Sequence, residues 1–156
     1  MKPKIQLKNF DNLISIQEHL FAQAKENHFS GSDPYDGLNS QFFQSLNLHR
    51  VEFFRLAWIQ LFRRSFINLR PITKTPSGFN PKAGGLFLAG TCRLAQRDPK
   101  YLSDCKNLWV KLSDAVIQTR SGVAWGYNFD WQSKAFFVAK GVPNVVSSVY
   151  VGQALL

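Results

Sequence analysis

The chain has 156 residues, of which 45% are hydrophobic and 14% aromatic, and it carries a formal net charge of +9 at pH 7. This length is enough for one domain with its own core, and the hydrophobic content excludes an intrinsically disordered chain. The charge favours an anionic partner, although a basic surface can also serve solubility alone. The basic residues are spread along the chain and no zinc-finger, RRM or basic-zipper pattern occurs, so we expect no nucleic acid partner.

The cysteines and the N-terminus indicate the compartment. Cys92 and Cys105 form no CxxC pair and are too few for a disulfide framework. The first residues contain charges but not the continuous apolar segment of a signal peptide. The most apolar window, residues 51–62, is shorter than the roughly 20 residues that a membrane span needs. We therefore expect a cytoplasmic protein without a membrane span.

The first predicted element is a helix over residues 10–27. Leu13, Ile16 and Leu20 recur at three- and four-residue spacing, which is typical of one stripe of an α-helix. Asp11 is expected to cap its N-terminus. The segment "FSGSDPYDGLNS", residues 29–40, then ends the helix with two glycines and a proline.

A second helix is predicted over residues 50–66, preceded by a short one at residues 40–47. Apolar side chains occupy most of the circumference of the longer helix, which predicts that it is buried between its neighbours. The segment "LRPITKTPSGFNPKAG" contains three prolines and is predicted to be a loop. A third helix is expected to begin near Pro81 and to end near Gln96.

The last third of the chain is predicted to hold two more helices. Asp98 is expected to cap a helix that Pro99 opens and that ends near Thr119. The aromatic loop of residues 124–137 follows, and "KAFFVAKG" is compatible with a short strand. A final helix is predicted from Val145 to the end of the chain. The expected fold is therefore all-α, built from antiparallel helical hairpins.

The final predicted helix lacks a stop signal. It runs to Leu155–Leu156 with no glycine or asparagine cap, so either its end is expected to be buried or the chain is part of something longer, and we favour the second interpretation. We therefore expect residues 1–156 to form a single domain that is the N-terminal portion of a longer one.

Two segments carry a family resemblance. "SDPYDGLNS" at residues 32–40 and "WGYNFDWQSKAFFVAKGVPNVVSSVYVGQALL" at residues 125–156 resemble the N-terminal part of bacterial α/α-toroid proteins of the six-hairpin glycosidase-like kind. Such proteins are associated with cell-surface polysaccharide metabolism. The resemblance implies a closed ring of helical hairpins with a substrate cleft at its centre, of which this chain supplies only a partial toroid. It implies no particular catalytic pair.

The aromatic loop has the composition of a sugar site. Flat aromatic faces pack against sugar C–H groups, and amides and carboxylates bind hydroxyls. The residues that fit this pattern are the aromatic Trp125, Tyr127, Phe129 and Trp131 and the amides Asn128 and Gln132, with Asp130 as a hydroxyl ligand or general base. The alternative is that these aromatic rings only fill the space between helices.

The first loop supplies the other candidates. Glycoside hydrolysis needs two carboxylates, and Asp36 with Asp130 is the predicted catalytic pair if both loops lie at one end of the helices. Asp33, Tyr35 and Asn39 are predicted to contact the substrate. The alternative is that Asp33 and Asp36 only cap turns through Asx hydrogen bonds.

The sequence contains no motif for a metal site, a serine nucleophile or a phosphate-binding loop. The three histidines have no HxxxH spacing, no GxSxG elbow occurs, and "KAGGLFLAG" is not a phosphate loop. We expect no metal and no other cofactor.

The leading hypothesis is a carbohydrate-active or carbohydrate-binding protein that acts on a surface polysaccharide or its precursor, either glycosidase-like or with another polysaccharide-modifying activity. The alternatives are a non-catalytic module that docks an acidic glycan or a partner protein, and an inactive truncated fragment. A partial ring of this kind could also be completed by a second copy of the chain or by another protein.

Overall fold

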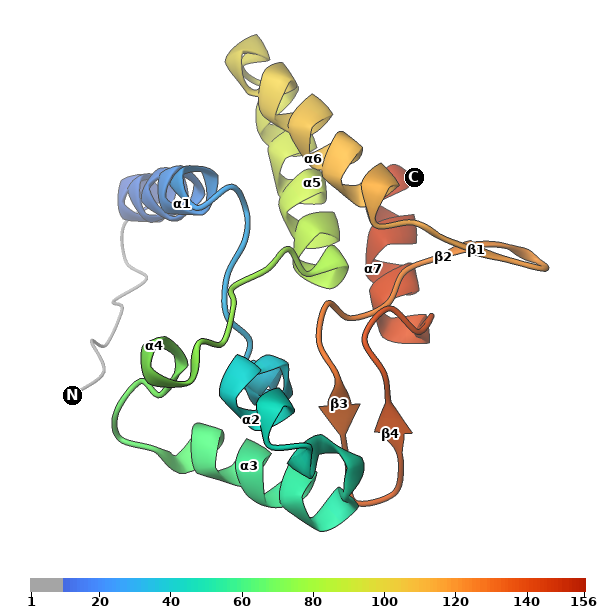
Figure 1. The fold of residues 1–156 in the computed structure, drawn as a ribbon. Helices are drawn as coiled ribbons and strands as arrows, with labels where there is room; N and C mark the ends of the chain where they lie inside the picture. The colour runs from blue at the N-terminus through green and yellow to red at the C-terminus, as the bar shows by residue number, and fades with distance from the viewer. Residues whose placement is uncertain (1–9) are drawn as a thin grey trace.

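In the computed structural model, which describes residues 10–156, the chain is largely helical with a few short antiparallel strands (Figure 1). The α-helices are α1 (Phe10–Glu26), α2 (Gln41–Ser45), α3 (Glu52–Arg64), α4 (Arg70–Thr73), α5 (Pro81–Ala95), α6 (Leu102–Asp114) and α7 (Val145–Leu155). Three 3-10 turns are η1 (Asp36–Asn39), η2 (Leu48–Arg50) and η3 (Pro99–Tyr101). The strands are β1 (Ile117–Thr119), β2 (Gly122–Ala124), β3 (Trp131–Gln132) and β4 (Phe137–Val138), which pair as β1–β2 and β3–β4.

The larger core, here called the upper cluster, lies where α5 packs against α6 and α7 (Figure 1). Its buried residues are Phe29, Leu88, Leu108, Leu112, Trp125 and Val151. Burial of each large apolar side chain stabilises the fold by about 1.5–3 kcal/mol. The indole Nε1 of Trp125 also donates to the carbonyl oxygen of Leu112 at 2.8 Å, so its polar atom is satisfied. The last loop is thereby fixed onto α6.

The close contact between α5 and α7 depends on a glycine. A Cβ atom at Gly85 would lie 2.8 Å from the carbonyl oxygen of Tyr150, closer than real Cβ atoms approach. The backbones of the two helices therefore pack directly against each other at this position.

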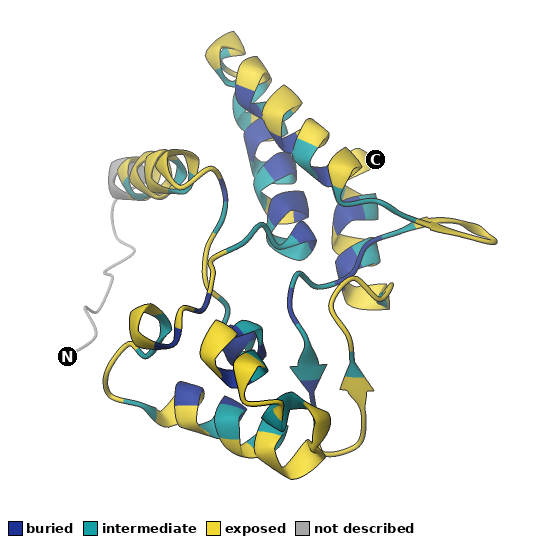
Figure 2. Ribbon diagram, in the orientation of Figure 1, coloured by how far each residue is buried: buried dark blue, intermediate teal, exposed yellow. Residues whose placement is uncertain are grey.

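The smaller core, here called the lower cluster, contains Leu38, Phe43 and Ile59 and lies among η1, α2 and α3. Trp58 stacks on Phe43 with ring centroids 4.9 Å apart and donates from Nε1 to the carbonyl oxygen of Gly37 at 2.9 Å. Figure 2 shows that the buried residues fall in two groups along the ribbon, one around α5–α7 and one around α2–α3.

Several predicted elements are confirmed. Helices lie at residues 10–26, 81–95 and 145–155, and a short strand lies at residues 137–138, all close to the predicted bounds. Asp98 caps as predicted, because its Oδ1 accepts from the N–H of Lys100 at 3.0 Å. The predicted cap at Asp11 falls on a side chain outside those that the structure describes.

The helix predicted to end near Thr119 is shorter than expected. Helix α6 ends at Asp114, and residues 117–119 instead form β1, which pairs Ile117 with Ala124. The β-branched residues Ile117 and Thr119 favour a strand, and Gly122 at φ 138° provides the turn back into β2. A purely all-α fold is therefore wrong in this region.

The predicted burial of residues 50–66 on all sides is also wrong. Only Ile59 and Phe62 of α3 are buried, whereas Phe53 is 72% exposed. Helix α3 has contacts with η1, η2 and β3, and its Phe54 and Leu61 are exposed as well. The loop predicted at residues 69–84 contains the short helix α4, which the prolines concealed.

Within residues 10–156, none of the helices has the length and apolar character needed to cross a membrane.

Candidate functional site

The two loops singled out in the sequence meet in space. The side-chain Nδ2 of Asn39 donates to the backbone carbonyl of Asn128 at 3.0 Å, across 89 residues of sequence. A pair of backbone hydrogen bonds between Gly31 and Gly78, at 3.0 and 2.9 Å, joins the first loop to the segment before α5. Three segments far apart in the chain are thus held side by side.

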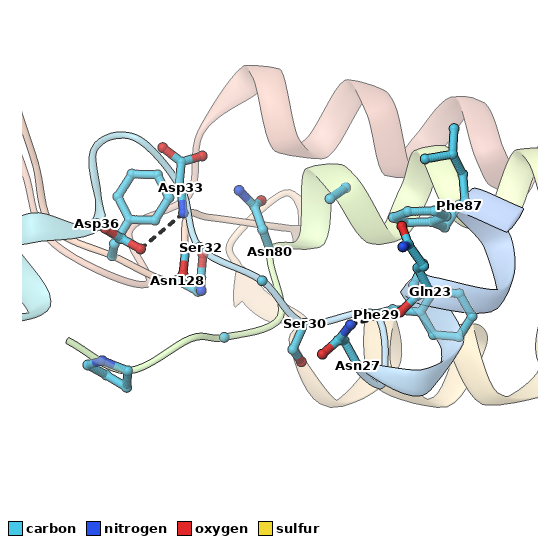
Figure 3. A pocket seen from close by; sticks show the side chains of 17 residues that line it. Gln23, Asn27, Phe29, Ser30, Ser32, Asp33, Asp36, Asn80, Phe87 and Asn128 are labelled. Atoms are coloured by element: carbon cyan, nitrogen blue, oxygen red, sulfur yellow. Dashed lines mark hydrogen bonds between the residues drawn. The ribbon is translucent and has the colours of Figure 1, made fainter. Parts of the chain in front are cut away.

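A cavity of about 340 Å³ lies at this junction (Figure 3). Its walls come from α1, the loop of residues 29–36, the segment of residues 76–83 and the aromatic loop at residues 128–129. The polar lining residues are Gln23, Asn27, Ser30, Ser32, Asp33, Asp36, Asn80 and Asn128, and the aromatic ones are Phe29, Phe87 and Phe129. The volume lies at the small end of the range for small-molecule sites.

The first loop is folded by its own aspartates. The Oδ1 of Asp33 accepts from the N–H of Tyr35 at 2.9 Å, which is the predicted Asx turn. The N–H of Asp33 in turn donates to Oδ2 of Asp36 at 3.0 Å, the bond drawn in Figure 3. The other carboxylate oxygen of Asp33 accepts no hydrogen bond from the described residues. Asp33 is therefore the carboxylate in the cavity wall that retains an oxygen for a ligand.

Asp36 is occupied by an ion pair. Its side chain is 5% exposed, and its Oδ1 lies 2.9 Å from Nη2 of Arg70. The Nε of Arg70 is 3.1 Å from each carboxylate oxygen, and Nη2 also donates to the carbonyl oxygen of Asp33 at 2.7 Å. Both oxygens of this buried carboxylate are therefore engaged by the guanidinium, in charge-assisted hydrogen bonds. Asp36 lines the cavity, but its geometry is that of a residue that organises the loop.

Asp130 plays a similar part in the second loop. Its Oδ1 accepts from the N–H of Lys140 at 2.7 Å and so closes the base of the β3–β4 hairpin. Asp130 is not among the residues that line the cavity, whereas Asp36 is. The two loops come together as the predicted shared site requires, but the two carboxylates do not face one cavity. Their role as a catalytic pair stays a prediction without geometric support here.

The aromatic loop divides into a buried part and a half-buried part. Trp125 is 5% exposed within the upper cluster, so it has no free face for a sugar, and the packing alternative describes it correctly. Tyr127 stacks on Phe129 with centroids 5.1 Å apart, and Trp131 meets the edge of Tyr127 at 6.4 Å. Of these rings, Phe129 lines the cavity, whereas Tyr127 and Trp131 are not among its lining residues.

The phenol of Tyr127 has an altered environment. Burial raises the pKa of Tyr127 above its usual range, and the negative charge of Asp33 raises it further. The phenol therefore stays protonated at neutral pH and remains a hydrogen-bond donor close to Asp33.

The other predicted contacts have structural partners. Gln132 is buried, accepts from Nε of Arg55 at 2.7 Å and donates to the carbonyl oxygen of Ser133, so its amide is fully engaged. The ring of Tyr35 lies beneath the guanidinium of Arg63 at 4.9 Å and packs against the lower cluster. Gln132 and Tyr35 thus connect elements and do not line the cavity.

Sequence reasoning missed most of the amide groups in the cavity wall. Gln23 lies in the last turn of α1 and Asn27 follows the last residue of that helix, and the spacing of four residues between them was the available signal. Asn80 is both a lining residue and the cap of α5, because its Oδ1 accepts from the N–H of Lys82 at 3.1 Å. The segment of residues 76–80 carried no recognisable motif.

No family model, no curated protein and no solved structure matches the chain significantly. The resemblance to α/α-toroid proteins therefore depends on the two quoted sequence segments.

Proposed function

We propose that the protein binds a carbohydrate, a segment of a cell-surface polysaccharide or its precursor, in the cavity between the two loops, and that its helical hairpins form part of an α/α toroid. The observation that carries this proposal is the meeting of the residue 29–40 loop with the aromatic loop, through Asn39 and Asn128, over one cavity.

The chemistry of the wall supports a neutral, hydroxyl-rich ligand. Amide and hydroxyl side chains both donate and accept, as a sugar's own groups do, and Phe87, which is half-buried where Phe29 and Phe129 are buried, supplies apolar surface for ring C–H groups. The Oδ1 of Asn128 is buried and accepts no hydrogen bond from the described residues. A small rotation of this side chain would present it to a ligand hydroxyl and remove the cost of an unpaired acceptor, about 1–3 kcal/mol.

We infer binding without turnover, and a polysaccharide-modifying activity is the second candidate. Binding without turnover is favoured because Asp36 is engaged by Arg70 and Asp130 accepts from the N–H of Lys140, so neither carboxylate is placed to transfer a proton to a ligand in the cavity. The substitution Asp130→Ala tests the predicted catalytic role of Asp130, because an enzyme that uses this carboxylate would lose turnover and keep glycan binding. A docking module would show binding that weakens with salt and is unaffected by the substitution.

The test is binding to an array of bacterial surface oligosaccharides. Asn128→Ala is expected to weaken binding about tenfold, the effect of one good polar contact. Gln118→Ala, an exposed amide in the β1–β2 hairpin, is the matched control and is expected to leave affinity unchanged. Equal effects of both substitutions, or no binding by the wild-type chain to any oligosaccharide, would contradict the proposal.

A further inference from the structure

A second hollow adjoins the cavity. It has a volume of about 430 Å³ and is open to solvent. Its lining residues are Ser32, Gln41, Asn68, Arg70, Pro71, Lys74, Thr75, Pro76 and Ser77. Ser32 and Pro76 also line the amide-rich cavity, so the two hollows share a wall.

The charge of this hollow is positive. Lys74 and Arg70 line it, and none of its lining residues is a carboxylate. Arg70 is already neutralised by Asp36, through the ion pair at 2.9 Å. Lys74 forms no ion pair within the described residues. The uncompensated charge in the hollow is therefore that of Lys74.

The surrounding groups are hydrogen-bond donors. The hydroxyls of Ser32 and Ser77 form no hydrogen bond within residues 10–156, and the exposed side chain of Gln41 is equally free there. The Nη1 of Arg70 likewise donates to none of the described residues. Hydroxyl, amide and guanidinium N–H groups around one ammonium are the donors that proteins direct at oxyanions.

The backbone at Lys74 is unusual for its residue type. Lys74 ends α4 at φ 52° and ψ 48°, in the left-handed region. Glycine or asparagine normally takes such a C-terminal position because a larger side chain is disfavoured there. A glycine at this site would ease the backbone but remove the charge.

The carboxylate of Asp33 determines how a ligand would be oriented across the cavity and the adjoining hollow. Its carboxylate lines the amide-rich cavity but not the basic hollow, so an anionic group is repelled from the first and attracted to the second. A ligand with one neutral and one anionic end therefore has a single favourable orientation.

We propose that the ligand is an anionic sugar, whose neutral ring occupies the cavity and whose phosphate or carboxylate lies against Lys74 in the adjoining hollow. This inference rests on the proposed carbohydrate binding for the ring, whereas the oxyanion subsite has a test of its own.

The experiment is a titration of the ¹⁵N-labelled full chain, followed by amide shifts at ionic strength matched with sodium chloride. The probes are inorganic phosphate, glucose, glucose 1-phosphate and glucuronic acid. Glucose 1-phosphate is expected to shift the amides of Ser77 and Lys74 together with the side-chain amide of Asn128, and to bind more tightly than glucose. Glucuronic acid shows whether a carboxylate substitutes for the phosphate.

The decisive variant is Lys74→Gly, which removes the charge and relieves the backbone, so lost binding cannot be ascribed to a destabilised fold. It is expected to weaken glucose 1-phosphate binding about five- to tenfold and to leave glucose binding unchanged. Lys134→Gly, an exposed lysine in the β3–β4 hairpin, is the control with the same change in net charge. Lys74→Arg is expected to restore binding.

The outcomes separate the two proposals. Shifts from glucose in the cavity, with no Lys74-dependent response to any anion, would overturn the anionic subsite and leave carbohydrate binding standing. Lys74-dependent phosphate shifts without any response of Asn128 to a sugar would support the subsite and overturn the carbohydrate proposal. If Lys74→Gly and Lys134→Gly weakened glucose 1-phosphate binding equally, the effect would come from net charge alone, and the subsite at Lys74 would be overturned.

Discussion

The upper and lower clusters are stabilised in different ways. The upper cluster joins six buried apolar residues from three helices and two loops. The lower cluster has three, and polar contacts surround it, among them Ser40 Oγ to the Thr73 carbonyl at 3.0 Å and Gln44 Nε2 to the Leu38 carbonyl at 2.8 Å. Apolar burial is the main stabiliser of one half, and hydrogen bonds and one ion pair contribute much of the order in the other.

The cavity lies at the boundary of these two halves. Helices α1 and α5 supply the wall nearer the upper cluster, and the Asp33–Asp36 turn supplies the wall nearer the lower one (Figure 3). We therefore expect the lower half to open locally at a smaller free-energy cost, and the geometry of the cavity to depend on it.

The largest expected effect is on the upper cluster. Trp125→Ala should lower the free energy of unfolding by about 3–5 kcal/mol, because it leaves a large cavity and removes the bond to the Leu112 carbonyl. Trp125→Phe keeps most of the apolar volume and should cost less. Urea denaturation followed by circular dichroism measures both, and a loss below about 1 kcal/mol for the alanine variant would contradict the central place given to Trp125.

The next effect tests the polar half. Arg70→Met leaves the carboxylate of Asp36 buried without its ion pair and should cost about 2–3 kcal/mol, reduced from the full value for a buried pair because Arg70 is 23% exposed. Hydrogen exchange should become faster in residues 36–64 and stay unchanged in α5–α7. Faster exchange everywhere would show that the two halves unfold as one unit.

Two glycines on α5, Gly85 and Gly90, test how closely this helix packs against α7 in the upper cluster. Gly85→Ala places a Cβ against the backbone of Tyr150 and should destabilise by about 1–3 kcal/mol. Gly90→Ala meets no atom within 4 Å and should stabilise by about 0.5–1 kcal/mol through helix propensity. Melting temperatures of the two variants should move in opposite directions, and movement in the same direction would contradict the direct contact of α5 with α7.

The smallest effect concerns the thiol of Cys105. Burial, with a contribution from the neighbouring Cys92 thiol, raises the pKa of Cys105 from 9.0 to about 11. Its alkylation by iodoacetamide should be slow at pH 8, where about one thiol in a thousand is ionised, and should rise roughly tenfold per pH unit up to 11.

The raised pKa of Cys105 also makes the free energy of unfolding depend on pH. Because the folded pKa exceeds the unfolded one, the folded chain holds its proton more tightly, and stability should fall as the pH rises from about 9 to 11. The urea-unfolded chain is the control for alkylation. Equal rates in the folded and unfolded chains at pH 8 would contradict the burial of this thiol.

The sequence predicted elements best where the signal was local. The cap at Asp98, the helix starts at Pro81 and Pro99 and the periodic stripe of α1 depend on residues within a few positions of each other. It failed at residues 117–119, where the same apolar pattern is compatible with a helix or a strand and the pairing with Ala124 decided the outcome. It also failed for α3, because periodicity states which faces are apolar but not whether a neighbour covers them.

The sequence by itself determined the helical character of the chain, its basic charge and the two loops rich in aromatic and acidic residues. Only the tertiary structure decided that Trp125 belongs to the core, that Asp36 is held by Arg70 and that the amides of Gln23, Asn80 and Asn128 line one cavity. The physical reason is that each of these outcomes depends on a contact between residues far apart in the chain. Residue type fixes what a side chain can do, and the fold determines which partner it meets.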